Sequence, residues 1–132
     1  MMYLDLIDGL LFSSIKVTHQ GKIVTIPHVV IDTGAAESII SIDAVQNLFD
    51  SYEPGDQIRF MTGIGGREAA IRRRIDELKL DSFLAYDFHI DFGRIGEYDG
   101  INGLIGLDLL IPGKFVIDLH RLNLYSVERS DE

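Results

Sequence analysis

Residues 29–38 read Val29-Val30-Ile31-Asp32-Thr33-Gly34-Ala35-Ala36-Glu37-Ser38, and they place an aspartate directly after an apolar, β-branched run. Such a run predicts a buried strand, so the Asp32 carboxylate begins near the core. Because a buried carboxylate without partners costs free energy, the residues after it should help to hold it. Small residues there let backbone groups approach closely. The simpler alternative is an aspartate that only ends a strand and opens a turn.

The composition is that of one soluble globular domain, since 132 residues can bury one core but not two. There is no cysteine, and the four histidines have no metal-ligand spacing, so we expect no metal and no cofactor. A formal charge of -9 argues against binding to nucleic acid or to an anionic membrane. The chain shows no signal-peptide pattern and no long apolar run, which predicts a cytoplasmic location and no membrane partner.

Strand-like patterns dominate the rest of the chain. Pro27 and His28 should separate a first hairpin from the strand before Asp32. Residues 41–49 predict a short helix with Ser41 as its N-cap, and residues 101–110 predict a short strand that runs into one helical turn. Asp118 also ends a strand but lacks a following Thr-Gly, so we interpret it as structural. The other strands are expected at residues 10–17, 23–26, 57–62, 84–92, 115–119 and 122–127.

Residues 68–78 allow two interpretations. They are good helix formers, and Ile71, Ile75 and Leu78 have helical spacing, so local propensity favours a helix. The preceding Gly63-Ile64-Gly65-Gly66 could instead be a hairpin tip whose return arm starts near residue 67. An ordinary tight turn is a further alternative, whereas a phosphate loop fails because no Lys-Ser/Thr follows. Arg72-Arg73-Arg74 predicts a solvated face, with contact to an acidic partner as the alternative. The four histidines are expected to be solvated or to cap other elements.

Three stretches occur in a characteristic order: Asp32-Thr33-Gly34-Ala35, then Gly63-Ile64-Gly65-Gly66, then Leu104-Ile105-Gly106. Together they resemble the retropepsin family, the single-domain aspartic proteases of retroviruses and their cellular and bacterial relatives. The resemblance implies a mainly β, single-lobe, closed β-barrel-like fold with a flap hairpin and one or two short helices. It covers residues 10–127, with residues 1–9 as an N-terminal segment and residues 128–132 as a C-terminal tail. It also implies that residues 67–80 form a strand.

The resemblance assigns roles to single positions. Asp32 would be the catalytic residue, and Thr33 and Gly34 would brace the pair of catalytic loops. Leu104, Ile105 and Gly106 would support the catalytic loop from behind. Viral members often carry an ion pair at the positions of Ala36 and Leu107, and this pair is absent here. The residues implied in substrate binding are Gly34, Ala35, Ala36, Ile64, Gly65 and Gly66.

Amide hydrolysis by carboxylates needs one as general base toward water and one as general acid toward the carbonyl. Two such groups close together share a proton. This chain holds a single Asp-Thr-Gly, so the second aspartate must come from another copy. The expected protein is therefore a homodimeric aspartic endopeptidase acting on a peptide or protein substrate. The alternative is a catalytically silent peptide-binding or dimerisation module with the same fold.

Overall fold

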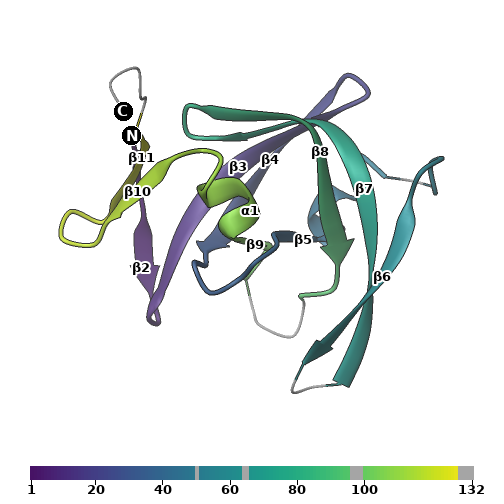
Figure 1. Ribbon diagram of the computed structural model, residues 1–132, viewed down its shortest axis with the longest axis horizontal. Coiled ribbons are helices and arrows are strands. Elements are labelled where there is room, and N and C mark those ends of the chain that lie inside the picture. The colour runs from purple at the N-terminus through teal and green to yellow at the C-terminus, as the bar shows by residue number, and fades with distance from the viewer. Residues whose placement is uncertain (50, 64–65, 96–99, 128–132) are drawn as a thin grey trace.

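The computed structural model describes residues 1–49, 51–63, 66–95 and 100–127, and it is built almost entirely from strands (Figure 1). The two short helices are the 3-10 helix η1 (Ile42–Val45) and the α-helix α1 (Leu107–Leu110). The strands are β1 (Met2–Tyr3), β2 (Asp5–Ile7), β3 (Leu10–His19), β4 (Lys22–Ile31), β5 (Ile39–Ser41), β6 (Gln57–Gly63), β7 (Gly66–Leu80), β8 (Phe83–Gly93), β9 (Gly103–Ile105), β10 (Phe115–Asp118) and β11 (Asn123–Ser126).

The strands form two sheets. The larger has the order β2-β3-β4-β9-β5-β8-β7-β6, and it curls until β7 also pairs with β3. The smaller has the order β1-β11-β10 and lies beside α1 (Figure 1). Strand β9 pairs in parallel with β4 and antiparallel with β5, so it lies between the two strands that flank the Asp32 stretch. The predicted mainly β architecture is confirmed.

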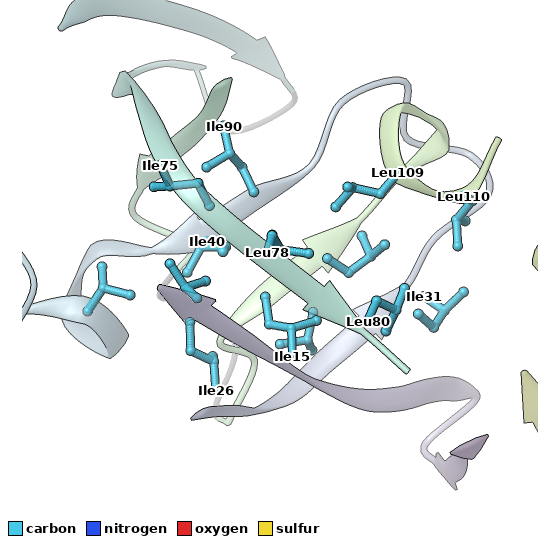
Figure 2. Close-up of a cluster of buried hydrophobic side chains, with 14 of the residues drawn as sticks. Ile15, Ile26, Ile31, Ile40, Ile75, Leu78, Leu80, Ile90, Leu109 and Leu110 are labelled. Carbon is cyan, nitrogen blue, oxygen red and sulfur yellow. The ribbon is translucent and has the colours of Figure 1, made fainter. Parts of the chain in front are cut away.

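A core of aliphatic side chains fills the interior of the larger sheet (Figure 2). Burying each such side chain contributes about 1.5–3 kcal/mol to the folded state. Ile31, which directly precedes Asp32, and Ile105 of β9 both belong to this core. The chain that follows Ile31 therefore leaves directly from the hydrophobic core. Other fully buried members are Ile15, Ile26, Ile40, Ile75, Leu78, Leu80, Ile90 and Leu109.

Residues 67–80 form a strand, as the family resemblance implied, and the helix favoured by local propensity is wrong. Strand β7 pairs with β6 along its first half, with β3 near its end, and with β8 from Ala70 to Leu80. Ile75 and Leu78 of this strand are both fully buried in the core that the curled sheet encloses. Tertiary burial and three strand partners outweigh the helix propensity of the segment.

Two local predictions around the first strands need correction. Strand β4 continues through Pro27 and His28, because a register shift against β3 absorbs the proline and His28 adopts a φ of 55°. The helix expected at residues 41–49 shrinks to the four residues of η1. Ser41 makes no side-chain cap hydrogen bond, since it is the last residue of β5.

The three consecutive arginines do not form a solvated face. Arg73 is only 5% exposed, donates to Asp56, and lies over the Phe49 ring, while Arg72 and Arg74 also pair with carboxylates. The side-chain hydrogen bond from Arg73 holds the pKa of Asp56 below its usual value. Because Arg73 lies on the opposite face of β7 from its two neighbours, it meets the core instead of solvent.

Two further predictions concern side chains at strand ends. His19 was expected to be solvated or capping, but it is buried with Nε2 3.0 Å from Glu53. A carboxylate from a distant loop makes this burial possible, and no local pattern reveals it. The structural interpretation of Asp118 agrees with its contacts, because its carboxylate accepts the Arg121 backbone N–H at 2.9 Å in the β10–β11 turn.

Neither of the two helices in the described part of the chain has the length and apolar character that crossing a membrane requires.

Candidate active site

The loop of residues 32–38, called here the Asp32 loop, starts where β4 ends. The backbone N–H of Asp32 donates to the carbonyl of Ile105 at 2.8 Å, which extends the β4–β9 pairing by one residue. Asp32 is thus held by the neighbouring strand at the last point before the chain turns. Its side chain is half-buried, whereas Thr33 and Gly34 are exposed.

The loop turns back on its own aspartate. The Gly34 N–H donates to Asp32 Oδ1 at 2.9 Å, and the Ala35 N–H donates to the Asp32 carbonyl at 3.2 Å. A Cβ atom on Gly34 would lie 3.2 Å from the same carboxylate oxygen, so a larger residue would crowd it. One carboxylate oxygen is therefore fixed by backbone, while Oδ2 receives no hydrogen bond from the described residues. That free oxygen is available to a proton or a water molecule.

Gly106 allows the loop to pack against the chain that follows β9. The Leu107 N–H donates to the Ala35 carbonyl at 2.8 Å, and the Asp108 N–H donates to the Ala36 carbonyl at 3.2 Å. A Cβ atom at position 106 would lie only 2.4 Å from the Ala35 oxygen, closer than real contacts allow. Glycine is thus required at position 106 for the Asp32 loop to reach these two donors.

A serine and an aspartate that the sequence analysis did not single out close the loop. Ser38 is buried, and its Oγ donates to Asp108 Oδ1 at 2.6 Å while accepting the Gly106 N–H at 2.9 Å. The Ser38 N–H donates to Asp108 Oδ2 at 2.9 Å. No motif marks the two residues as partners. The only available signal was that Ser38 and Asp108 lie within three residues of the ends of two recognised stretches.

An apolar pocket of about 440 Å³ opens beside Asp32. Two smaller pockets, of about 260 and 280 Å³, share Ile42, Tyr52, Ile71 and Phe92, and Asp32 lines neither. In the described residues, no three His, Asp or Glu side chains are grouped so that they could hold a metal ion. The 440 Å³ pocket combines one carboxylate with apolar walls, namely Gly9, Leu10, Leu11, Val30, Ile31, Ile95, Ile101 and Leu104.

The comparison with family models shows which family the chain belongs to. A family model described as an aspartyl protease matches residues 15–109, which span most of the chain and include the Asp32 loop and Gly106. The chain belongs to the aspartyl protease family. A search of curated proteins finds no match to this chain.

The fold of this family member is also similar to that of solved structures. One of them is the crystal structure of a retropepsin-like aspartic protease from Rickettsia conorii, which matches this chain with a TM-score of 0.59 and 18% sequence identity. The match covers 89% of this chain and 83% of that chain. At this identity the likeness shows the fold, and the predicted retropepsin-like fold is confirmed.

The structure brings together two of the three stretches that the sequence analysis singled out for this family member. Ala35 lies against Gly106 and accepts the Leu107 N–H, and the Ile105 carbonyl accepts the Asp32 N–H. Leu104 pairs with Val30 and lines the pocket. In the remaining stretch, residues 63–66, Gly63 pairs with Gly66 at the end of the β6–β7 hairpin, and Ile64 and Gly65 lie outside the described residues. The functional roles assigned to these residues, including the catalytic role of Asp32, stay predictions.

Proposed function

We propose that this chain is an aspartic endopeptidase in which a water molecule is activated between Asp32 and the Asp32 of a second copy. The observation that carries this proposal is the arrangement of the Asp32 carboxylate. One oxygen accepts the Gly34 N–H at 2.9 Å, and the other is free of described donors beside an apolar pocket. A carboxylate that only ends a strand has no need of such a pocket.

The chemistry requires a pair of carboxylates that carry one proton between them. The ionised one takes a proton from the attacking water, and the protonated one donates its proton to the carbonyl oxygen of the peptide. One chain supplies one such aspartate, so a two-fold axis between two copies is the simplest way to complete the pair. The exposed Thr33 hydroxyl and Gly34 would then brace the two loops against each other.

An apolar hairpin beside the pocket supports association of two copies. In the β2–β3 hairpin, Leu6 is 57% exposed, Ile7 is 45% exposed and Leu10 is 38% exposed. Leu10 also lines the pocket that contains Asp32. Exposed apolar groups gathered at one place commonly mark an interaction surface. A second copy seated here would cover them and bring its own aspartate toward Asp32.

The proposed substrate is an extended peptide. The apolar pocket suits an apolar side chain next to the bond that is cleaved, and the small side chains of Gly34, Ala35 and Ala36 would let the peptide lie close to the loop. The Gly34 carbonyl would face the peptide backbone, because the Ala35 and Ala36 carbonyls already accept the Leu107 and Asp108 N–H groups. The hairpin tip, with Ile64, Gly65 and Gly66, would act as a flap over it. Such a flap covers the reacting groups during the reaction and opens to release product.

Digestion of a diverse peptide mixture tests the proposal. Wild type and Asp32→Asn would run side by side from about pH 4 to 7, with cleavage sites read by mass spectrometry, since the amide keeps the shape but cannot act as the base. We expect cleavage by the wild type alone, with an apolar residue beside the cleaved bond. Equal cleavage by both proteins would refute the role of Asp32. A wild-type dimer that cleaves nothing would favour the silent binding module.

A further inference from the structure

Glu37 lies at the exposed end of the Asp32 loop and reaches across to the β6–β7 hairpin. Its Oε2 atom accepts a hydrogen bond from Arg59 Nη2 of β6 at 2.9 Å and one from Arg72 Nη2 of β7 at 2.8 Å. Ser38, the next residue, is buried and fixed by Asp108. Glu37 is therefore a charged side chain on a rigid base that contacts both strands of the hairpin.

The two arginines are anchored differently. Arg72 also donates through Nε to Asp91 at 2.8 Å, and Asp91 is only 2% exposed. The hydrogen bond to Asp91 is the main reason that the pKa of Arg72 is raised. For Arg59, Glu37 is the one acid that the described residues place within ion-pair distance. Loss of Glu37 would leave Arg72 held by Asp91 but would release Arg59.

The sheet topology makes the contact with Arg59 important. Strand β6 is the last strand of the larger sheet and, among the described residues, pairs only with β7; the hairpin extends away from the sheet body (Figure 1). In the register, Gln57 faces Arg72 and Arg59 faces Ala70, so the two arginine side chains lie on one face of the hairpin. That face is turned toward Glu37. The bond from Glu37 to Arg59 thus ties the outer strand directly to the Asp32 loop.

We propose that Glu37 is a positioning residue that holds the β6–β7 hairpin at a fixed distance from the Asp32 loop and thereby sets the affinity of the site for its peptide. The consequence for peptide affinity rests on the proposed protease function. Glu37 is partly exposed, and exposed ion pairs contribute little to global stability. A weak, solvent-accessible contact of this kind can break and re-form as a peptide enters and leaves.

The first experiment follows the hairpin without reference to catalysis. Amide hydrogen exchange of β6 would be compared in wild type, Glu37→Gln and Asp87→Asn. The matched control Asp87→Asn removes an exposed acid that pairs with Arg74 of β7, but it joins β7 to β8, which already pair along their length. We expect exchange in β6 to rise severalfold in Glu37→Gln alone, with the thermal midpoint unchanged within about one degree. Unchanged exchange in β6 would overturn the inference.

The second experiment measures cleavage of an uncharged peptide, so that the charge of the substrate plays no part. Glu37→Gln should raise KM about three- to tenfold while kcat changes less than twofold. Arg59→Met should do the same, and the double variant should be no worse than either single variant, because both remove one interaction. Added salt should raise KM for the wild type and have little effect on Glu37→Gln, since salt screens exposed pairs. A KM equal to that of the wild type would overturn the inference.

The two experiments separate this inference from the function on which it rests. If the wild type cleaves no peptide but β6 exchange still rises in Glu37→Gln, the proposed protease function fails and the hairpin contact stands. If cleavage depends on Asp32 but neither β6 exchange nor KM responds to Glu37→Gln, the function stands and the positioning role fails.

Discussion

Ser38 and Asp108 are joined by two hydrogen bonds, one from the serine hydroxyl to Oδ1 at 2.6 Å and one from the serine N–H to Oδ2 at 2.9 Å. The same hydroxyl accepts the Gly106 N–H, so a single side chain connects the end of the Asp32 loop, β9 and the first turn of α1. The end of the loop that begins with Asp32 is thus fixed by a second carboxylate, that of Asp108, which takes no part in the proposed chemistry.

Removing this hydroxyl should weaken the fold. Ser38→Ala leaves the Gly106 N–H and one Asp108 oxygen without their partner in a buried place, which costs about 1–3 kcal/mol. Urea denaturation followed by circular dichroism measures the loss. Ser14→Ala is the matched control, because Ser14 of β3 makes no side-chain hydrogen bond among the described residues and should change stability by less than about 0.5 kcal/mol. Equal losses in the two variants would contradict this role of Ser38.

Gly106→Ala should both destabilise the protein and reduce cleavage. Its Cβ atom would collide with the Ala35 carbonyl, and overpacking of this kind costs about 1–3 kcal/mol. Gly21→Ala is the control for backbone strain without a collision. Gly21 has a φ of 80°, which strains an alanine, and no atom lies within 4 Å of its Cβ position. We expect Gly21→Ala to lower the unfolding free energy without changing the rate of peptide cleavage. A Gly106→Ala protein with wild-type cleavage would contradict the prediction.

The ion pair between Arg73 and Asp56 should make stability fall in acid. The pKa of Asp56 is lowered in the folded state, chiefly by the Arg73 hydrogen bond, so its contribution is full above about pH 4, the region of the unfolded pKa. The contribution is lost as the pH falls through the lower folded value. Asp56→Asn should therefore be less stable than wild type by about 3 kcal/mol at pH 7, and the difference should shrink below pH 4. Denaturation of both proteins at pH 7, 5, 4 and 3 measures this difference in stability. A difference that stays constant with pH would show that the ion pair between Arg73 and Asp56 is not its cause.

The β2–β3 hairpin should control assembly. Leu6→Arg and Ile7→Arg place charges on the proposed contact surface and should weaken dimerisation at least tenfold, equivalent to about 1.4 kcal/mol. Sedimentation velocity over a concentration series gives the dissociation constant, and cleavage should recover at high protein concentration. Ile23→Arg is the control, because Ile23 near the start of β4 is 67% exposed and does not line the pocket that contains Asp32. An unchanged dissociation constant in both hairpin variants would place the contact elsewhere.

The sequence predicted those features whose cause is local or carried by a motif. Alternation of apolar residues marked β8, and the apolar run before Asp32 marked the end of β4. The arrangement of Gly106 against the Asp32 loop followed from the family resemblance. Propensity alone failed at β7, because its three strand partners are distant in sequence and leave no trace in its own composition.

The features that could not be predicted are pairs of polar residues from distant segments. His19 meets Glu53, Arg73 meets Asp56, and Ser38 meets Asp108 only after the sheet has curled. Each of these residues is of a polar type that is usually found at the surface. Only the partner makes its burial favourable, and pairing of this kind has no periodicity that a single sequence displays.

The position of β9 between β4 and β5 has a consequence for the order of events during synthesis. Asp32 emerges from the ribosome long before residues 103–108, which supply the hydrogen bonds that hold its loop. Contacts so far apart in the chain form late, since the intervening segment must first be closed into a loop. A nascent or truncated chain that ends before β9 therefore carries the aspartate without its supporting strand. On the proposed function, such a chain lacks the braced aspartate that cleavage requires.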